Sequence, residues 1–268
     1  AAGVKMLITV GDDDVVQHVR DSLPECPNLE YYVTVGDKPV DGAIDYRSVI
    51  GGYSTEFERP TDPEKRTVVT DTALLYFSSG TTGFPKAILH AHKALINSCR
   101  TEQNHHGQQK DDVFLCIPPL YHTGAKMHWF GSLLSAGKAV ILKGVKPEWI
   151  LRTVSEEGCT IVWLLVPWAQ DILDAIDRGE IRLEDYRLSQ WRLMHIGAQP
   201  VPPSLIKRWE KVFPHHQYDT NYGLSPAACI LAWKISTRSA RSVCPAISGR
   251  RMSSLRTAHR YRGMKWAS

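Results

Sequence analysis

The stretch that decides the fold is Leu75-Tyr76-Phe77-Ser78-Ser79-Gly80-Thr81-Thr82-Gly83-Phe84-Pro85-Lys86. Apolar residues 73–77 predict a strand, and the loop that follows is rich in Ser, Thr and Gly. Glycines and small hydroxyl residues let backbone N–H groups approach an anion closely, and Lys86 adds a positive charge. This composition favours a triphosphate-binding loop, although Pro85 stands where the usual P-loop has its second Gly. The alternative is a Gly/Thr-rich surface turn.

Around this stretch, residues 1–225 alternate between strand-like and helix-like segments. Strands are expected over 4–10, 31–35, 73–78, 113–117, 139–142, 160–166, 192–196 and 217–219. Helices are expected over 13–22, 90–99, 125–135, 147–157, 167–177 and 203–212. Several strands are continuous apolar runs, which are typical of strands buried on both faces. The alternation predicts an α/β fold with parallel sheets flanked by helices. The polar stretch 36–63 is expected to be a long connection.

The composition describes a globular chain of 268 residues, 43% hydrophobic and 22% charged. We see no apolar stretch of transmembrane length and no signal peptide, and we expect a cytoplasmic protein. The chain starts with Ala rather than Met, which suggests a fragment or a processed start. The cysteines are scattered, without a C-x-x-C pair, and favour free thiols. Neighbours in sequence rarely face the same way, so the pairs His105-His106 and His215-His216 are predicted to be surface or capping histidines rather than metal ligands.

Three more motifs follow predicted strands, and ligands of open α/β sheets bind at the carboxyl ends of strands. The first is Pro118-Pro119-Leu120-Tyr121-His122, for which the alternative is a turn with a capping His. The second is His195-Ile196-Gly197-Ala198-Gln199-Pro200, whose small residues would let a flat base lie on the backbone. Its alternative is a plain strand-to-helix turn. The third is Asp219-Thr220-Asn221-Tyr222-Gly223-Leu224-Ser225.

These motifs, in this order, resemble those of the adenylate-forming superfamily: acyl-CoA synthetases, luciferases and peptide-synthetase adenylation domains. The resemblance covers residues 1–225 and implies part of the large N-terminal domain, with its beginning and the small C-terminal domain absent. It implies ATP, Mg²⁺ and coenzyme A as the small molecules bound. The reaction it implies is activation of a carboxylic acid, of the fatty acid class, to an acyl-adenylate and then to an acyl-CoA thioester.

The resemblance also assigns roles to individual residues. The phosphate-binding residues it implies are Ser78, Ser79, Gly80, Thr81, Thr82, Gly83 and Lys86. The remaining nucleotide-binding residues it implies are Gly197, Ala198, Gln199, Asn221, Tyr222, Gly223 and Ser225. Among these, Tyr222 would stack on adenine and Ser225 would contact the α-phosphate. The catalytic residues it implies are Lys86, Thr82 and His122, with His122 and Gly197 on the acyl side.

One position departs from the family pattern. The family has a magnesium-binding Glu after the residue that corresponds to Ser225, and this chain has Pro226. We therefore predict no metal ligand there and expect this chain to turn over little or no substrate. Three functions stay open: an acyl-CoA ligase, a nucleotide-binding remnant without turnover, and an adenylating enzyme with an acceptor other than coenzyme A.

Residues 226–268 form a basic tail with nine Lys and Arg and no Asp or Glu. The preceding 225 residues carry 23 basic and 28 acidic side chains, a net charge of −5, although the whole chain is +4. We interpret the tail as an unstructured product of a frameshift. Codons compatible with residues 230–249, read two bases later, permit a Gly-x-x-Gly-x-Pro-Gly string like the family segment that follows the Tyr-Gly motif. The alternative is a basic arm that binds nucleic acid or acidic lipid; we predict no nucleic acid partner.

Overall fold

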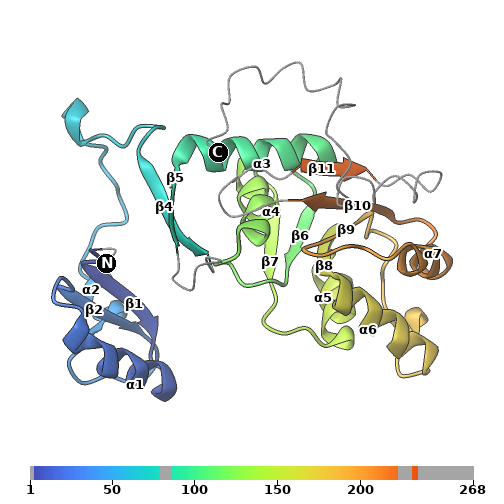
Figure 1. Ribbon diagram of the computed structural model, residues 1–268, viewed down its shortest axis with the longest axis horizontal. Coiled ribbons are helices and arrows are strands. Elements are labelled where there is room, and N and C mark those ends of the chain that lie inside the picture. The colour runs from blue at the N-terminus through green and yellow to red at the C-terminus, as the bar shows by residue number, and fades with distance from the viewer. Residues whose placement is uncertain (1–2, 79–85, 223–230, 235–268) are drawn as a thin grey trace. The chain divides into compact units, whose positions relative to one another are not determined.

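The computed structural model describes residues 3–78, 86–222 and 231–234, and has a mixed α/β architecture (Figure 1). The chain divides into two compact units, Ala1–Val68 and Val69–Ser268. Among the described residues, none of the helices combines the length and the apolarity needed to cross a membrane.

The N-terminal unit contains a small parallel sheet in the order β1 (Met6–Val10), β2 (Tyr31–Val35) and β3 (Ile44–Asp45). Helix α1 (Asp13–Ser22) and a 3-10 turn (Leu23–Glu25) join β1 to β2.

Residues 36–63, predicted to be a long connection, contain regular secondary structure. They contain β3 and the short helix α2 (Tyr46–Ile50), and a 3-10 turn follows at Pro63–Lys65. The carboxylate of Asp45 accepts hydrogen bonds from the backbone N–H groups of Arg47 and Ser48, at 3.3 and 3.2 Å. This capping interaction, together with the pairing of β3 to β2, organises a segment that lacks an apolar pattern.

The second unit begins with an antiparallel hairpin of β4 (Thr72–Ser78) and β5 (Lys86–Ala91), in which Ser78 lies opposite Lys86. Strand β5 was not predicted, since residues 87–89 offer too short an apolar run to stand out. Helix α3 (His92–His106) follows directly and extends well past the expected end at residue 99. It stops at Gly107, whose φ of 56° favours glycine and whose N–H donates to the carbonyl of Gln103.

The main sheet has six strands in the order β11-β10-β9-β8-β6-β7 (Figure 1). Its parallel strands are β6 (Val113–Cys116), β7 (Lys138–Ile141), β8 (Ile161–Leu165), β9 (Leu193–Gly197) and β10 (Gln217–Tyr222). Each of these overlaps a predicted strand, so the expected parallel sheet is confirmed. Strand β11 (Leu231–Lys234) pairs antiparallel with β10. These four residues of the basic tail are therefore strand rather than unstructured chain, and its residues 226–230 and 235–268 lie outside the described residues.

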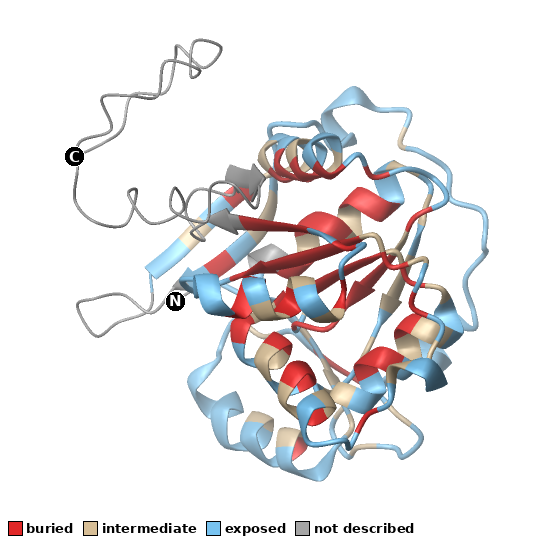
Figure 2. Ribbon diagram, turned by 90° about the vertical axis from the view of Figure 1, so that its right-hand side faces the viewer, coloured by how far each residue is buried: buried red, intermediate tan, exposed pale blue. Residues whose placement is uncertain are grey.

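Helices cover both faces of this sheet, as expected. One face packs against α5 (Pro147–Glu157), α6 (Val166–Asp177) and α7 (Pro203–Val212), and a 3-10 turn (Leu183–Asp185) follows α6. The other face packs against α4 (Thr123–Leu134) and α3. The hairpin joins this second layer, because β4 packs against α3 and α4. Figure 2 shows the buried residues gathered on the sheet and on the helix sides that face it.

The helix boundaries follow local rules where those rules are strong. Both α5 and α7 begin with Pro in their first turn, where a backbone N–H has no partner to lose. Helix α5 ends at Gly158, which has a φ of 68° and donates its N–H to the carbonyl of Val154. These signals are why both helices were predicted with the bounds that the structure has.

Candidate functional site

Three predicted segments meet at the carboxyl edge of the main sheet. Leu165 at the end of β8 pairs with Gly197, and Ile196 pairs with Thr220, so Asn221 lies beside Gly197 on the next strand. The segment 118–122 leaves β6 at the same edge, on the other side of β8. The geometry therefore brings 118–122, 197–199 and 221–222 together where open α/β sheets bind ligands.

Ala198 has an unusual backbone at this edge. Its φ of 67° lies in the left-handed region, which residues with a Cβ rarely adopt. Such a conformation costs on the order of 1 kcal/mol and tends to occur at functional sites. Both Ala198 and Gln199 are exposed, so their backbone is open to a ligand.

His122 is exposed and stands directly before α4, at the N-cap position. The backbone N–H of His122 donates to the carbonyl of Pro119, so the turn of the alternative interpretation is present, but the imidazole makes no capping hydrogen bond to the helix. The ring instead lies against Tyr121, with 4.6 Å between centroids, and Tyr121 is 70% exposed. Two aromatic side chains are thus available to a ligand at this edge.

The phosphate-binding prediction falls mostly on residues 79–85, which lie outside the described residues, as do Gly223, Ser225 and Pro226. Lys86 is the first residue of β5 and is exposed, and its backbone pairs with Ser78 across the hairpin. Ser78, Asn221 and Tyr222 are described by their backbone alone. The binding roles of all these residues stay predictions.

A buried cluster of polar side chains on the α3 and α4 side of the sheet was not predicted. We define the histidine cluster as Glu102 and His106 of α3, His128 of α4 and His195 of β9, flanked by Asp219 of β10. His106 Nε2 lies 3.0 Å from Asp219 Oδ2, and His128 Nε2 lies 2.6 Å from His195 Nδ1. All five side chains are buried.

This cluster corrects the prediction for the adjacent histidines. His106 and His216 are buried, at 7% and 5% exposure, rather than on the surface. His105 keeps more exposure, and its Nε2 lies 2.5 Å from Asp219 Oδ2. The missed signal was a polar residue inside a predicted buried strand, as at His195, together with the Glu102 and His106 pair at i and i+4 on one helix face.

Burial sets the charge state of two of these imidazoles. Desolvation lowers the pKa of His106, and the hydrogen bond to Asp219 opposes part of that shift. Desolvation lowers the pKa of His128 well below its usual value, and the charges of His106 and Arg192 act in the same direction. Both imidazoles are therefore neutral at pH 7.

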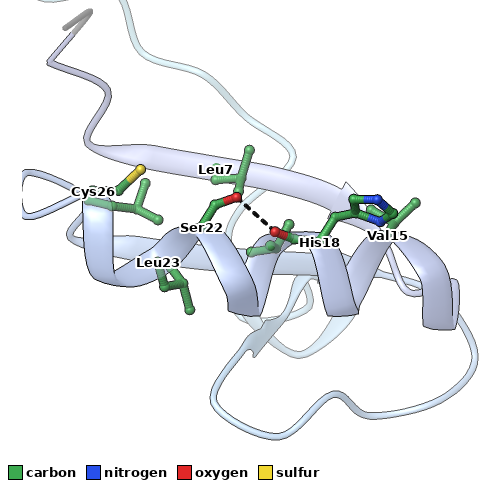
Figure 3. Close-up of a pocket in the computed structure, with 8 residues that line it drawn as sticks. Leu7, Val15, His18, Ser22, Leu23 and Cys26 are labelled. Carbon is green, nitrogen blue, oxygen red and sulfur yellow. Dashed lines mark hydrogen bonds between the residues drawn. The ribbon is translucent and has the colours of Figure 1, made fainter.

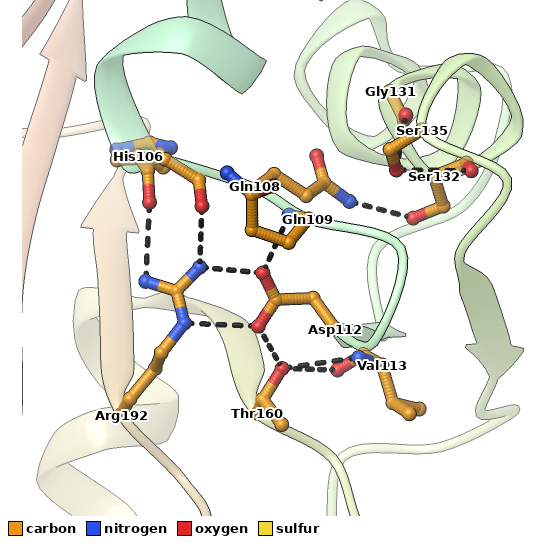
Figure 4. A network of polar contacts seen from close by, with 11 residues as sticks. His106, Gln108, Gln109, Asp112, Val113, Gly131, Ser132, Ser135, Thr160 and Arg192 are labelled. Atoms are coloured by element: carbon orange, nitrogen blue, oxygen red, sulfur yellow. Dashed lines mark hydrogen bonds and ion pairs between the residues drawn. The ribbon is translucent and has the colours of Figure 1, made fainter.

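An ion pair fixes the end of α3 next to the cluster (Figure 4). Arg192 donates to both carboxylate oxygens of Asp112, at 2.9 and 2.7 Å, and to the carbonyls of His106 and Gly107. Thr160 donates to the same carboxylate. Burial alone would raise the pKa of Asp112, but these hydrogen bonds outweigh it and the pKa is lowered.

A separate hollow of about 350 Å³ lies between β1 and α1 in the N-terminal unit (Figure 3). Its lining is largely apolar and includes Leu7, Val15 and Leu23. The polar groups there bond within α1, since Ser22 donates to the carbonyl of His18. The hollow contains no predicted site residue and offers no convergent polar groups, so we assign it no ligand.

Comparisons with known proteins point to one family. The family model described as AMP-binding enzyme matches residues 1–256. The chain is 26% identical over 241 residues to a protein named 4-coumarate–CoA ligase 3 from Oryza sativa subsp. japonica, covering 87% of this chain and 40% of that protein. It is 28% identical over 205 residues to acetyl-coenzyme A synthetase from Bacillus subtilis (strain 168), covering 75% of this chain and 34% of that protein.

A solved structure shares the fold. The anthranilate CoA ligase AuaEII, in complex with anthranoyl-AMP, superposes with a TM-score of 0.76 at 20% identity, covering 88% of this chain and 44% of that one. The chain thus spans less than half the length of each relative named here.

Proposed function

Because this chain belongs to the AMP-binding enzyme family, we propose that it supplies the nucleotide-binding and acid-binding face of an acid–thiol ligase. The whole enzyme would join a carboxylic acid to ATP, release pyrophosphate, and pass the acyl group from the acyl-adenylate to coenzyme A. The observation that carries this proposal is the meeting of 118–122, 197–199 and 221–222 at one sheet edge, with the strained backbone of Ala198 in the middle segment.

The chain's own residues have separate tasks in this proposal. The substrate carboxylate oxygen attacks the α-phosphorus, and the bond to the bridging oxygen of pyrophosphate breaks. Lys86 and the N–H and hydroxyl donors of residues 78–83 stabilise the charge that develops on the departing pyrophosphate. Exposed Ala198 and Gln199 offer a flat backbone surface to the adenine. His122 contacts the acid, and its imidazole is exposed and makes no capping hydrogen bond to α4.

Magnesium does not fit the residues that this sequence provides after Ser225. Pro226 has no side-chain ligand atom, and residues 227–268 contain no Asp or Glu. Asp219 is the nearest preceding carboxylate, and it is buried against His105 and His106. We therefore derive no step through Mg²⁺, and the same departure supports the second candidate, a remnant that binds nucleotide without turnover.

We propose a carboxylic acid as the substrate. The sequence predicts a fatty acid, and this class is tested together with other acids. Three apolar side chains of α4 could line a long apolar channel or belong to the core. Trp129 and Phe130 are partly buried and pack against the core clusters, whereas Leu134 is 45% exposed. The relatives carry names of different acids, namely 4-coumarate, acetate and anthranilate. The panel therefore includes these three and a long-chain fatty acid.

The experiment measures ATP binding to this chain by equilibrium dialysis and ATP–pyrophosphate exchange with each acid. Lys86→Ala should weaken ATP binding about tenfold or more, because a charged hydrogen bond contributes about 1.5–3 kcal/mol. Lys110→Ala is the matched control, because Lys110 is an exposed lysine ahead of β6, at the opposite edge of the sheet. Equal ATP affinity in the two variants contradicts the assignment.

Two outcomes separate the remaining candidates. Binding without exchange for any acid supports the nucleotide-binding remnant. Exchange without thioester formation on addition of coenzyme A supports an adenylating enzyme with another acceptor.

A further inference from the structure

Four side chains of metal-binding type converge in the histidine cluster, and none of them has a part in the proposed reaction. Glu102 and His106 come from α3, His128 from α4 and His195 from β9. One donor atom from each lies within 4.8 Å of the other three. The side chains are almost fully buried, with exposed fractions of 0%, 7%, 0% and 1% in that order.

Two of the distances between donor atoms are close to those of a tetrahedral zinc site. Glu102 Oε2 lies 3.4 Å from His106 Nδ1 and 3.7 Å from His128 Nε2. With metal–ligand bonds of about 2.0–2.1 Å, tetrahedral donors lie about 3.3 Å apart. His128 Nε2 and His195 Nδ1 are closer, at 2.6 Å. These two nitrogens would have to separate by roughly 0.7 Å, which a small rotation of one imidazole provides.

A carboxylate beyond the four ligands orients one of the imidazoles. His106 directs Nδ1 toward Glu102 and places Nε2 3.0 Å from Asp219 Oδ2. A ligand histidine that donates its second N–H to a carboxylate is the usual arrangement around protein-bound metals.

A polar core without metal accounts for these groups less well. Only one of the two nitrogens in the contact between His128 and His195 can carry the proton that joins them. Within the part of the chain that the structure describes, His106 Nδ1 and His128 Nδ1 have no hydrogen-bond partner. Buried polar atoms without such partners are costly, and a metal ion would take His106 Nδ1 as a ligand.

We propose that Glu102, His106, His128 and His195 bind Zn²⁺ in a closed structural site that fastens α3 and α4 to β9. Three imidazole nitrogens and one carboxylate oxygen suit Zn²⁺, and four protein ligands in a buried position leave no open coordination place for a substrate. His195 lies two residues before Gly197, so the ion holds the strand that leads into the candidate nucleotide-binding segment. The site does not depend on the proposed ligase activity.

The test is the metal content of the purified chain after exhaustive dialysis, measured by mass spectrometry. We expect about one Zn²⁺ per chain, and a loss of most of it in His128→Ala and in His195→Ala. His18→Ala is the control, because His18 is an exposed histidine of α1 and should leave the zinc content unchanged. A zinc content below about one tenth of an equivalent, or equal contents in all four proteins, overturns the proposal.

A second measurement does not depend on the variants being folded. The wild-type chain is stripped with a chelator and then titrated with Co²⁺ alone. A tetrahedral site with nitrogen and oxygen ligands is expected to produce intense visible absorption that saturates near one equivalent and disappears on addition of Zn²⁺. Weak visible absorption, as expected of octahedral Co²⁺, or absorption that does not saturate with added Co²⁺, would mean that the cluster is a hydrogen-bonded polar core.

Discussion

The two faces of the main sheet are built from the same strands and differ in what they bury. Toward α5, α6 and α7 the strands direct apolar side chains such as Leu164, Met194 and Ile196, all with 0% exposure. Toward α3 and α4, the neighbouring positions of β9 and β10 direct His195 and Asp219. Side chains alternate along a strand, so one residue of offset separates an apolar core from a polar cluster.

The two faces of the sheet therefore stabilise the fold in different ways. Buried apolar area stabilises the fold without specific partners, whereas a buried imidazole or carboxylate stabilises only when its hydrogen bonds or ligands are complete. The apolar face therefore holds the sheet together. The polar face depends on defined neighbours, which is where a bound ion can matter.

The largest effect should come from the apolar face. Leu164→Ala removes a fully buried side chain of β8 and should lower the free energy of unfolding by about 2–5 kcal/mol, through lost burial and the cavity left behind. Urea unfolding measures it. Leu133→Ala on α4 is the control, because Leu133 is 62% exposed and should change stability by less than about 0.5 kcal/mol. A similar loss of unfolding free energy in both variants would contradict the assignment of Leu164 to the core and Leu133 to the surface.

The ion pair of the polar face should have the next largest effect. Arg192→Ala leaves the buried Asp112 carboxylate without its two charged hydrogen bonds and should cost about 2 kcal/mol at pH 7. The folded pKa of Asp112 is lowered from 3.8, so the stability that the pair contributes is complete above that pH and is lost as the pH falls below it.

The measurement is urea unfolding of wild type and variant at pH 7 and pH 3. The gap between the two proteins should shrink at the lower pH. A gap that stays constant would mean that Arg192 acts by packing alone.

A pH-dependent effect is expected beside the apolar face, at His216. Its imidazole stacks on Phe213, and Trp209 Nε1 donates to its Nδ1 at 3.2 Å. Burial lowers the pKa of His216 from 6.5 to about 3. The unfolded chain therefore binds a proton that the folded chain does not, and stability falls as the pH drops from 6.5 toward 3, by up to about 1.4 kcal/mol per pH unit.

His216→Phe keeps the stacking and removes the titration. At pH 7 the variant should lose about 1 kcal/mol, since Trp209 loses its acceptor. Between pH 6.5 and pH 5 it should regain about 2 kcal/mol relative to wild type. Chemical unfolding at the two pH values measures both quantities, and parallel pH profiles for the two proteins would contradict the buried neutral imidazole.

The smallest change in stability is expected at the strained alanine. Ala198→Gly relieves a positive φ but makes the unfolded chain more flexible, so the two effects should cancel to within about 0.5 kcal/mol. Ala136→Gly is a matched control, since Ala136 has a φ of 55° in the turn between α4 and β7. Nucleotide affinity should change only in the Ala198 variant, and equal affinities would mean that the strain has no part in binding.

Local signals in the sequence were enough for much of the fold. Proline in the first turn and glycine after the last turn act within a few residues, so α5 was predicted with its observed bounds. The continuous apolar run of residues 162–166 identified β8 as a buried parallel strand. Strand β5 and the second half of α3 were not predicted. Strand β5 is defined by its pairing with β4, and residues 100–106 are polar in sequence although the structure buries Glu102 and His106.

The candidate ligand edge was predicted as a set of separate motifs. Their order along the chain and their positions after strands implied one edge of a parallel sheet, and the register of Gly197 with Leu165 places them there. The left-handed backbone of Ala198 could not be predicted, because alanine ordinarily avoids that conformation and only its surroundings can impose it.

The sequence by itself determined the parallel α/β class and the candidate ligand-binding motifs, since these depend on local spacing and on which residues follow a strand. Only the tertiary structure decided that His106, placed on the surface by its sequence neighbours, is buried against Asp219, more than a hundred residues away in the chain. Whether a histidine is a surface group or a ligand depends on which distant elements pack around it. The spacing of residues along the sequence does not predict which distant elements these are.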